Sequence, residues 1–180
     1  MTELADNFSK LNIEPEAQSN IVNRGTGAGG SGTNKTGLSF EDKTVICKSG
    51  ELKLGDKVFI RVIKSELNKK LKDEYVKREK RLNPDEAFID IENKKLFIIE
   101  KKFQQCNGSV DEKIQTAIFK REFYKELYPA YEINYCYCLC NWFKKDKYKP
   151  EMRYFKKYNI PVFWGEDKNY VDEIKKWLLN

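Results

Sequence analysis

The stretch NPDEAFIDIENKKLFIIEKKFQQ, residues 83–105, contains two apolar runs that a short polar segment separates. The first run, AFIDI, spans residues 87–91, and the second, KLFIIE, spans residues 95–100. Each run has the length of a strand and is nearly continuous in hydrophobicity, a pattern typical of strands covered on both faces. The stretch therefore predicts a β-hairpin in the centre of a sheet.

Three charged residues lie at one end of this predicted hairpin. Asp85 precedes the first strand, and Glu100 and Lys102 end the second. Side chains alternate along a strand, so Glu100 and Lys102 should share a face. Charges at such a depth are costly unless they pair with each other or bind a metal ion. A salt bridge at the sheet edge and a metal site are both compatible with this pattern.

The rest of the chain alternates between helical and strand patterns. A capping box at Ser109 and Glu112 begins a predicted long amphipathic helix that reaches residue 127. Helices are also predicted from about residue 38 and over 65–82, 150–159 and 170–179, and strands over 57–64, 133–143 and 160–164. This order predicts an α/β fold with a central mixed β-sheet flanked by helices.

The length of 180 residues suits a single domain. We expect a polar, partly helical segment over residues 1–23, a glycine-rich segment over 24–37 and the folded domain over 38–180. No apolar run approaches the 18 or so residues of a membrane span, and residues 1–10 lack a signal-peptide pattern. We therefore expect a cytoplasmic protein without a membrane partner.

The cysteine and histidine content limits the chemistry. The five cysteines are an odd number, and Cys136, Cys138 and Cys140 alternate within a predicted strand, so we expect reduced core residues and no zinc site. The chain has no histidine, which excludes histidine-based nucleophilic catalysis and histidine–metal nuclease motifs. Any hydrolysis must use carboxylates, lysine and a hard metal ion such as Mg²⁺, which prefers oxygen ligands.

The net charge of +6 is unevenly distributed. Residues 64–81 contain eight basic and four acidic residues, and residues 144–157 contain seven basic and two acidic residues with aromatic residues among them. Such runs often form solvated helix faces, but two of them together favour a polyanionic partner.

The segment RGTGAGGSGTNKTG, residues 24–37, contains six of the ten glycines. It matches G-x-G-x-x-G, but the preceding residues are too polar for a buried strand, and Asn34 replaces the glycine that precedes the P-loop lysine. A nucleotide site is therefore disfavoured. A flexible linker and a loop that contacts another polyanion both fit the composition.

Pro84-Asp85 followed by Glu100-x-Lys102 after a hydrophobic strand resembles the PD-(D/E)xK nuclease superfamily. The motif covers residues 84–102, and the order of elements extends the resemblance over about residues 38–180. Four stretches, GAGGSGTNKTGLSFE, PDEAFI, IIEKKFQ and GSVDEKIQTAIFK, are similar to type II restriction endonucleases. The resemblance implies a restriction-endonuclease-like core and Mg²⁺-dependent, sequence-specific hydrolysis of double-stranded DNA to 5′-phosphate and 3′-hydroxyl ends.

The resemblance also implies roles for individual residues. Asp85, Glu100 and the backbone carbonyl of Lys101 would hold Mg²⁺, for which Mn²⁺ could substitute, and Lys102 would position or help deprotonate the attacking water. Glu41, in the predicted first helix, would face the metal site.

Three residues are weaker candidates. Gln104 lies two residues beyond Lys102 on the same strand face, and Gln115 lies near the start of the predicted long helix. Asp90 is an alternative first carboxylate, although it has the opposite strand parity to Asp85 and lacks the preceding proline.

The glycine-rich segment is then expected to contact DNA, because glycines let backbone N–H groups approach phosphates and base edges closely. A homodimer is expected, since palindromic sites match two-fold symmetric proteins, and the family implies a cognate DNA methyltransferase acting on the same site. The alternatives are a structure-specific nuclease such as a junction resolvase and a DNA-binding module without activity. The residues expected to contact DNA are Arg24, Gly29, Gly30, Ser31, Asn34 and Lys35.

Overall fold

A computed structural model describes residues 30–72, 74, 76, 82–106 and 110–180. These residues form an α/β fold in which a six-stranded mixed sheet is flanked by helices. The helices are α1 (Gly30–Lys43), α2 (Glu66–Lys70), α3 (Val110–Ile114), α4 (Ala117–Leu127), α5 (Lys149–Lys157) and α6 (Tyr170–Leu179), with 3₁₀ turns η1 (Asn141–Lys144) and η2 (Asp146–Tyr148). The strands are β1 (Glu51–Leu54), β2 (Lys57–Val62), β3 (Glu86–Asp90), β4 (Lys95–Lys102), β5 (Glu132–Leu139) and β6 (Val162–Trp164).

The strands lie in the sheet in the order of the sequence, from β1 to β6. The first four pair antiparallel, and β5 and β6 then continue parallel to β4. Because β4 and β5 are parallel, their carboxyl ends meet at one edge of the sheet, where Lys102 pairs with Leu139. Loops that follow these strands therefore gather beside the charged end of β4.

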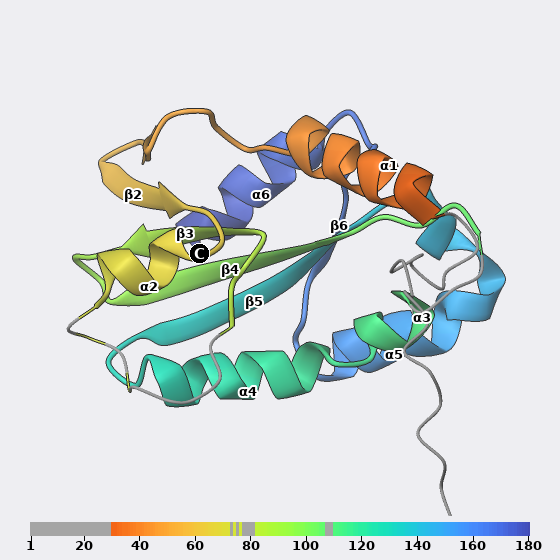
Figure 1. Ribbon diagram of the computed structural model, residues 1–180. Helices are drawn as coiled ribbons and strands as arrows, with labels where there is room; N and C mark the ends of the chain where they lie inside the picture. The colour runs from red at the N-terminus through yellow and green to blue at the C-terminus, as the bar shows by residue number, and fades with distance from the viewer. Residues whose placement is uncertain (1–29, 73, 75, 77–81, 107–109) are drawn as a thin grey trace, which may run out of the picture.

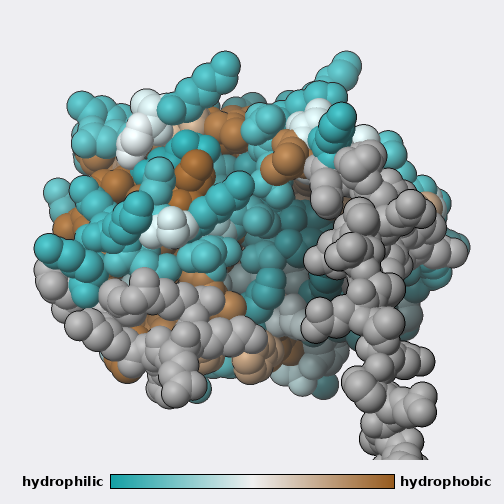
Figure 2. All heavy atoms as spheres, viewed as in Figure 1, coloured by the Kyte–Doolittle hydropathy of each residue, from teal (hydrophilic) through white to brown (hydrophobic). Residues whose placement is uncertain are grey.

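Helices cover both faces of the sheet (Figure 1). Helices α1 and α6 lie on one face, where the rings of Phe97 and Trp177 pack edge to face at 5.2 Å. Helices α4 and α5 lie on the other, where Tyr135 packs against Tyr124 of α4. In the view of Figure 2 hydrophilic side chains cover most of the described surface, with scattered hydrophobic ones between them. None of the helices within the described residues is long and apolar enough to cross a membrane.

The predicted central hairpin is confirmed. Strands β3 and β4 pair antiparallel with Glu86 opposite Ile99, and every residue of β3 is buried. The turn between them is held by Asp90, whose carboxylate accepts hydrogen bonds from the backbone and side-chain nitrogens of Asn93 at 3.0 and 2.8 Å. An Asx-type turn of this kind fixes the hairpin register. Register in turn determines which side chains meet at the opposite end.

In the first half of the chain one strand was missed and one predicted helix was too long. Strand β1 was not predicted, and it pairs with β2 through a two-residue turn in which Gly55 has a φ of 59°. The helix predicted over 65–82 is limited, within the described residues, to the five residues of α2, and Leu71 and Lys72 already form a turn. Ser65, the residue before α2, makes no capping hydrogen bond with its side chain.

The long helix predicted up to residue 127 is broken into α3 and α4 at Gln115 and Thr116. The Thr116 hydroxyl donates to the Lys113 carbonyl at 2.8 Å, and the Tyr137 hydroxyl of β5 donates to the Ile114 carbonyl at 3.0 Å. These side-chain bonds take carbonyls that a continuous helix would pair with backbone N–H groups. The predicted capping serine, Ser109, lies outside the described residues.

Helix α1 begins earlier than the expected start near Leu38, because residues 30–37 already have helical backbone. The prediction of a loop is therefore wrong for this half of the glycine-rich segment, and Arg24 and Gly29 lie outside the described residues. An added Cβ at Gly37 would meet no atom within 4 Å, so folding does not require glycine there. At Gly165, by contrast, an added Cβ would lie 2.6 Å from the Thr44 methyl group, and this glycine lets the end of α1 pack closely beside β6.

Candidate active site

Asp85 is fixed at the amino end of β3 by its neighbour strand. Its Oδ2 atom accepts a hydrogen bond of 2.7 Å from the backbone N–H of Lys101, and Lys102 Nζ lies 3.5 Å from the same oxygen. The antiparallel pairing of β3 and β4 brings these residues together across the hairpin. The carboxylate is therefore oriented before any ligand arrives.

Glu100 and Lys102 lie on one face of β4, as their spacing predicts. Lys102 Nζ lies 2.6 Å from Glu100 Oε1 and donates to the carbonyl of Lys101 at 2.9 Å. The side chains of Glu100 and Lys102 are 8% and 16% exposed, so the pair is largely shielded from water. The structure thus brings Asp85, Glu100 and Lys102 together, as predicted from the hairpin.

Lys120 is a fourth member of this cluster that sequence reasoning missed. It projects from α4, and its ammonium contacts Glu100 Oε1, the same oxygen that Lys102 approaches. The sequence did contain a sign of its role, because Lys120 lies on the helix face defined by buried Ala117 and Tyr124. A lysine within an apolar stripe needs a buried acidic partner.

The cluster favours charged forms of both Glu100 and Lys102. Burial alone would raise the pKa of Glu100, but the ammonium groups of Lys102 and Lys120 outweigh it and hold this pKa below its usual range. Burial would lower the pKa of Lys102, but Glu100 and Asp85 raise it above its usual value. At neutral pH the site therefore holds an ionised glutamate and a protonated lysine.

Glu41 of α1 lies close enough to Asp85 for their charges to interact. Burial, followed by the nearby charge of Asp85, raises the pKa of the Glu41 carboxyl group. A repulsive carboxylate close to Asp85 has little value for folding, since its charge opposes that of its neighbour. A function that uses both negative charges would explain why they lie together.

The pKa of Glu41 leads to a stability prediction. A raised folded-state pKa means that the folded chain binds this proton more tightly than the unfolded chain, so the stabilising contribution of the protonated group is lost as pH rises through the folded pKa. We expect Glu41→Gln to melt at a higher temperature than wild type at pH 8 in EDTA, with little difference at pH 4. Thermal melts at the two pH values test this. Destabilisation at pH 8, or an equal shift at both, would contradict it.

The side chain of Lys101 lies on the other face of β4, toward α1 and α6. Its ammonium lies 2.9 Å from Glu86 Oε2 as an ion pair without hydrogen-bond geometry, and it donates to the carbonyls of Glu41 and Thr44 at 3.2 and 3.0 Å. Arg61 Nε lies 2.5 Å from the other oxygen of Glu86. This buried set of charges joins the end of α1 to β4 and so positions Glu41.

The weaker candidates lie outside the carboxylate–lysine cluster. Asp90 is at the opposite end of β3 from Asp85, and its carboxylate is used by the hairpin turn. Gln104 is buried and donates to Asp111 at 2.8 Å, while its Oε1 atom has no hydrogen-bond partner among the described residues. Gln115 is exposed in the turn between α3 and α4. None of the three contacts Glu100 or Lys102 within the described part of the chain.

Three of the seven basic residues in the second basic run pair with nearby acids. Lys144 pairs with Asp167 at 2.7 Å, Lys147 with Asp111 at 3.3 Å, and Lys149 with Asp146 at 3.0 Å. Lys145 instead lies over the ring of Trp142, 3.0 Å from its centroid. These contacts weaken the inference of a polyanion surface from the sequence of this run, because paired lysines attract phosphates less strongly.

The alternating cysteines are core residues, as expected. Cys136, Cys138 and Cys140 are buried free thiols, and burial raises the pKa of Cys138 to about 11. A thiol with so high a pKa is neutral at physiological pH.

The donor atoms at the cluster fit Mg²⁺ by their chemistry. Asp85, Glu100 and the Lys101 carbonyl offer hard oxygens, and Glu100 Oε2 makes no hydrogen bond with the described residues. Among the described residues, however, no group of three or more histidine, cysteine, aspartate or glutamate side chains is already gathered around one point as a metal site. Lys102, which contacts both Asp85 and Glu100, holds their negative charges together in this state.

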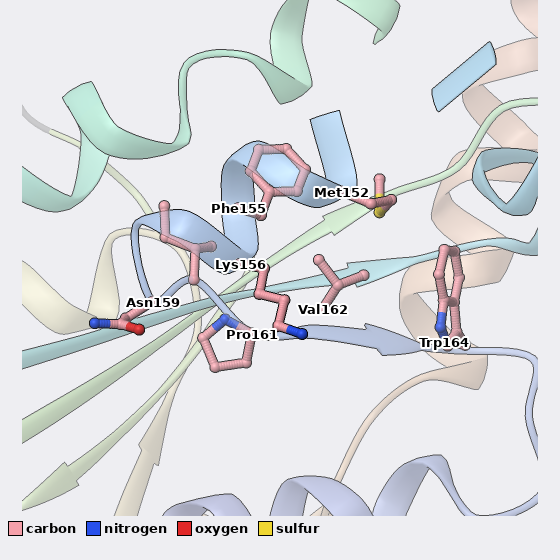
Figure 3. Close-up of a pocket in the computed structure, with 8 residues that line it drawn as sticks. Met152, Phe155, Lys156, Asn159, Pro161, Val162 and Trp164 are labelled. Carbon is pink, nitrogen blue, oxygen red and sulfur yellow. The ribbon is translucent and has the colours of Figure 1, made fainter. Parts of the chain in front are cut away.

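A separate groove of about 490 Å³ lies between α5 and β6 (Figure 3). Its lining is mostly apolar and includes an ammonium group but no carboxylate. It therefore offers no acid–base pair. The lining residues are Met152, Phe155, Lys156, Asn159, Ile160, Pro161, Val162 and Trp164.

No family model, curated protein or solved structure matches the chain. The functional interpretation therefore depends on the geometry of the carboxylate–lysine cluster, formed by Asp85, Glu100, Lys102 and Lys120 with Glu41 beside it.

Proposed function

We propose that the chain is a type II restriction endonuclease, which hydrolyses phosphodiester bonds in double-stranded DNA at a short specific sequence. The single observation that supports this most strongly is the convergence of Asp85, Glu100 and Lys102 at the end of the β3–β4 hairpin. A carboxylate pair beside a protonated lysine suits a reaction in which negative charge develops on a phosphate.

Mg²⁺ held by Asp85, Glu100 and the Lys101 carbonyl, with Glu41 nearby, would lower the pKa of a bound water and offset charge on the phosphate. The chain's own residues supply the rest. Lys102 is protonated in the ligand-free chain, so it acts as a hydrogen-bond donor that orients the water and stabilises the charge on the phosphate. The Asp85 carboxylate is already oriented, because the Lys101 N–H group donates a hydrogen bond to one of its oxygens.

In the overall reaction the water oxygen bonds to phosphorus and the bond to the 3′ oxygen breaks. The departing oxygen is protonated, so one water molecule is consumed for each strand cut. The products are 5′-phosphate and 3′-hydroxyl ends. We further propose a homodimer on palindromic DNA and a cognate methyltransferase that protects the same site.

Digestion of phage DNA tests this function. With Mg²⁺ or Mn²⁺ we expect discrete fragments whose sequenced ends share one short motif, and with EDTA we expect none. Cleavage of four-way junctions but not of linear duplex would instead indicate a structure-specific nuclease. Tight DNA binding without cleavage under any metal condition would indicate a binding module.

The glycine-rich segment gives a second prediction. Lys35 is exposed on α1, so replacing Asn34 and Lys35 with alanine removes no core contact of Lys35 and improves helix propensity. We expect a melting temperature within a few degrees of wild type and weaker DNA binding. Each lost contact with a base edge should weaken the binding free energy by about 1–3 kcal/mol. A lost phosphate contact should instead reduce the slope of log binding constant against log salt concentration by about one. Unchanged affinity across a salt series would show that Asn34 and Lys35 do not contact DNA.

A further inference from the structure

The ammonium of Lys120 shares its acceptor with another lysine. Lys120 Nζ contacts Glu100 Oε1, and Lys102 Nζ lies 2.6 Å from the same atom. One carboxylate oxygen is thus shared by two ammonium groups. Two cations on one oxygen repel each other, so this arrangement is easily changed when another anion approaches.

The two lysines are not held equally. Lys102 has three acceptors, Glu100, Asp85 and the carbonyl of Lys101, whereas Lys120 has Glu100 as its one acceptor among the described residues. The Lys120 side chain is also more exposed, at 24% against 16%. Lys120 is therefore the lysine that can leave Glu100 with the smaller loss of contacts.

The position of Lys120 suits a different acceptor. It projects from α4 toward the site, and a lysine ammonium on a flexible four-carbon chain can turn from one acceptor to another. A DNA phosphate placed beside Asp85 and Glu100 for hydrolysis would lie within the neighbourhood of this ammonium. Its non-bridging oxygens would offer Lys120 an unshared negative charge.

We propose that Lys120 is a phosphate-binding residue, held on Glu100 in the DNA-free chain and transferred to a backbone phosphate of bound DNA. This inference rests on the proposed function, because it requires DNA at the cluster. Glu100 then has two roles: it keeps Lys120 ordered before binding, and it limits the affinity for DNA until the ammonium is released. If the Lys120–Glu100 ion pair were purely structural, it would remain intact when DNA binds.

A double-mutant cycle in EDTA tests the exchange through binding alone. Wild type, Glu100→Gln, Lys120→Met and the double variant are titrated against a labelled 30-base-pair duplex over 50–300 mM KCl. Glu100→Gln keeps the shape of the side chain and removes the competing charge, so we expect several-fold tighter binding and a salt slope steeper by about one. Adding Lys120→Met should remove that gain, whereas Lys120→Met alone should have a smaller effect. Thermal melts confirm that each variant is folded.

Lys125→Met in the Glu100→Gln background is the matched control. Lys125 is also on α4, but it pairs with exposed Glu122, and its loss should leave the gain in place. The proposal is overturned if Lys120→Met leaves the gain intact, or if its effect is equal with and without Glu100. A chain that binds in EDTA with the expected coupling but cuts no DNA in Mg²⁺ would contradict the proposed function alone.

Discussion

Replacing Lys102 or Glu100 with alanine should abolish DNA cleavage while DNA binding persists. Lys102→Ala removes the ammonium that contacts Asp85, Glu100 and the Lys101 carbonyl, and Glu100→Ala removes the carboxylate on which two lysines converge. Loss of a single preorganised charge-stabilising group typically costs about 10²–10³ in kcat, and loss of a proposed metal ligand should cost at least as much. Single-turnover cleavage of phage DNA and duplex titration in EDTA measure the two properties separately.

Lys95→Ala is the matched control for these variants. Lys95 lies on the same strand, β4, at its opposite end, where its ammonium donates to the carbonyl of Asn180 at 3.0 Å. We expect cleavage at the wild-type rate. Cleavage by Lys102→Ala at a rate similar to that of Lys95→Ala would show that the cluster is not the site of hydrolysis.

The site was predictable where it depended on strand geometry. Period-two alternation placed Glu100 and Lys102 on one face, and the length of the hairpin brought Asp85 to the same end. The position of Lys120 on the apolar face of α4 was a local signal for a buried acidic partner, but the identity of that partner, Glu100, depends on how α4 packs against the sheet. Glu86 was missed for a similar reason. It lies in a continuous apolar strand, and the cations that compensate its buried charge, Arg61 and Lys101, come from other strands.

The fold was predictable in its hydrophobic elements and less so at their junctions. The buried hairpin, β5, α5, β6 and α6 follow from apolar periodicity. Strand β1 was missed although Gly55-Asp56 between two short strands is a hairpin-turn signal. The break between α3 and α4 depends on a hydroxyl from β5, and the early start of α1 opposes the low helix propensity of glycine. A tertiary contact with a distant residue therefore decides the break between α3 and α4.

The stability of this half of the sheet should be sensitive to the loss of any one of the buried charges behind the site. The Glu86 side chain is 0% exposed and the Lys101 side chain 3% exposed, and Arg61 completes the set at 15%. Burying an ion pair brings little net stabilisation, but removing one partner leaves the other charge buried without compensation. Lys101 also holds the carbonyls of Glu41 and Thr44, so its loss would release the end of α1.

Glu86→Leu should therefore lower the free energy of unfolding by about 3–5 kcal/mol, measured by urea denaturation. The exposed pair of Glu122 and Lys125 is the control, and Glu122→Ala should cost less than about 1 kcal/mol. Adding Lys101→Met to Glu86→Leu replaces the two most deeply buried of the three charges with apolar groups, so the double variant should be more stable than the sum of the single losses predicts. Additive losses would show that the two charges do not stabilise each other. A loss for Glu86→Leu no larger than for Glu122→Ala would show that the ion pair is not buried in solution.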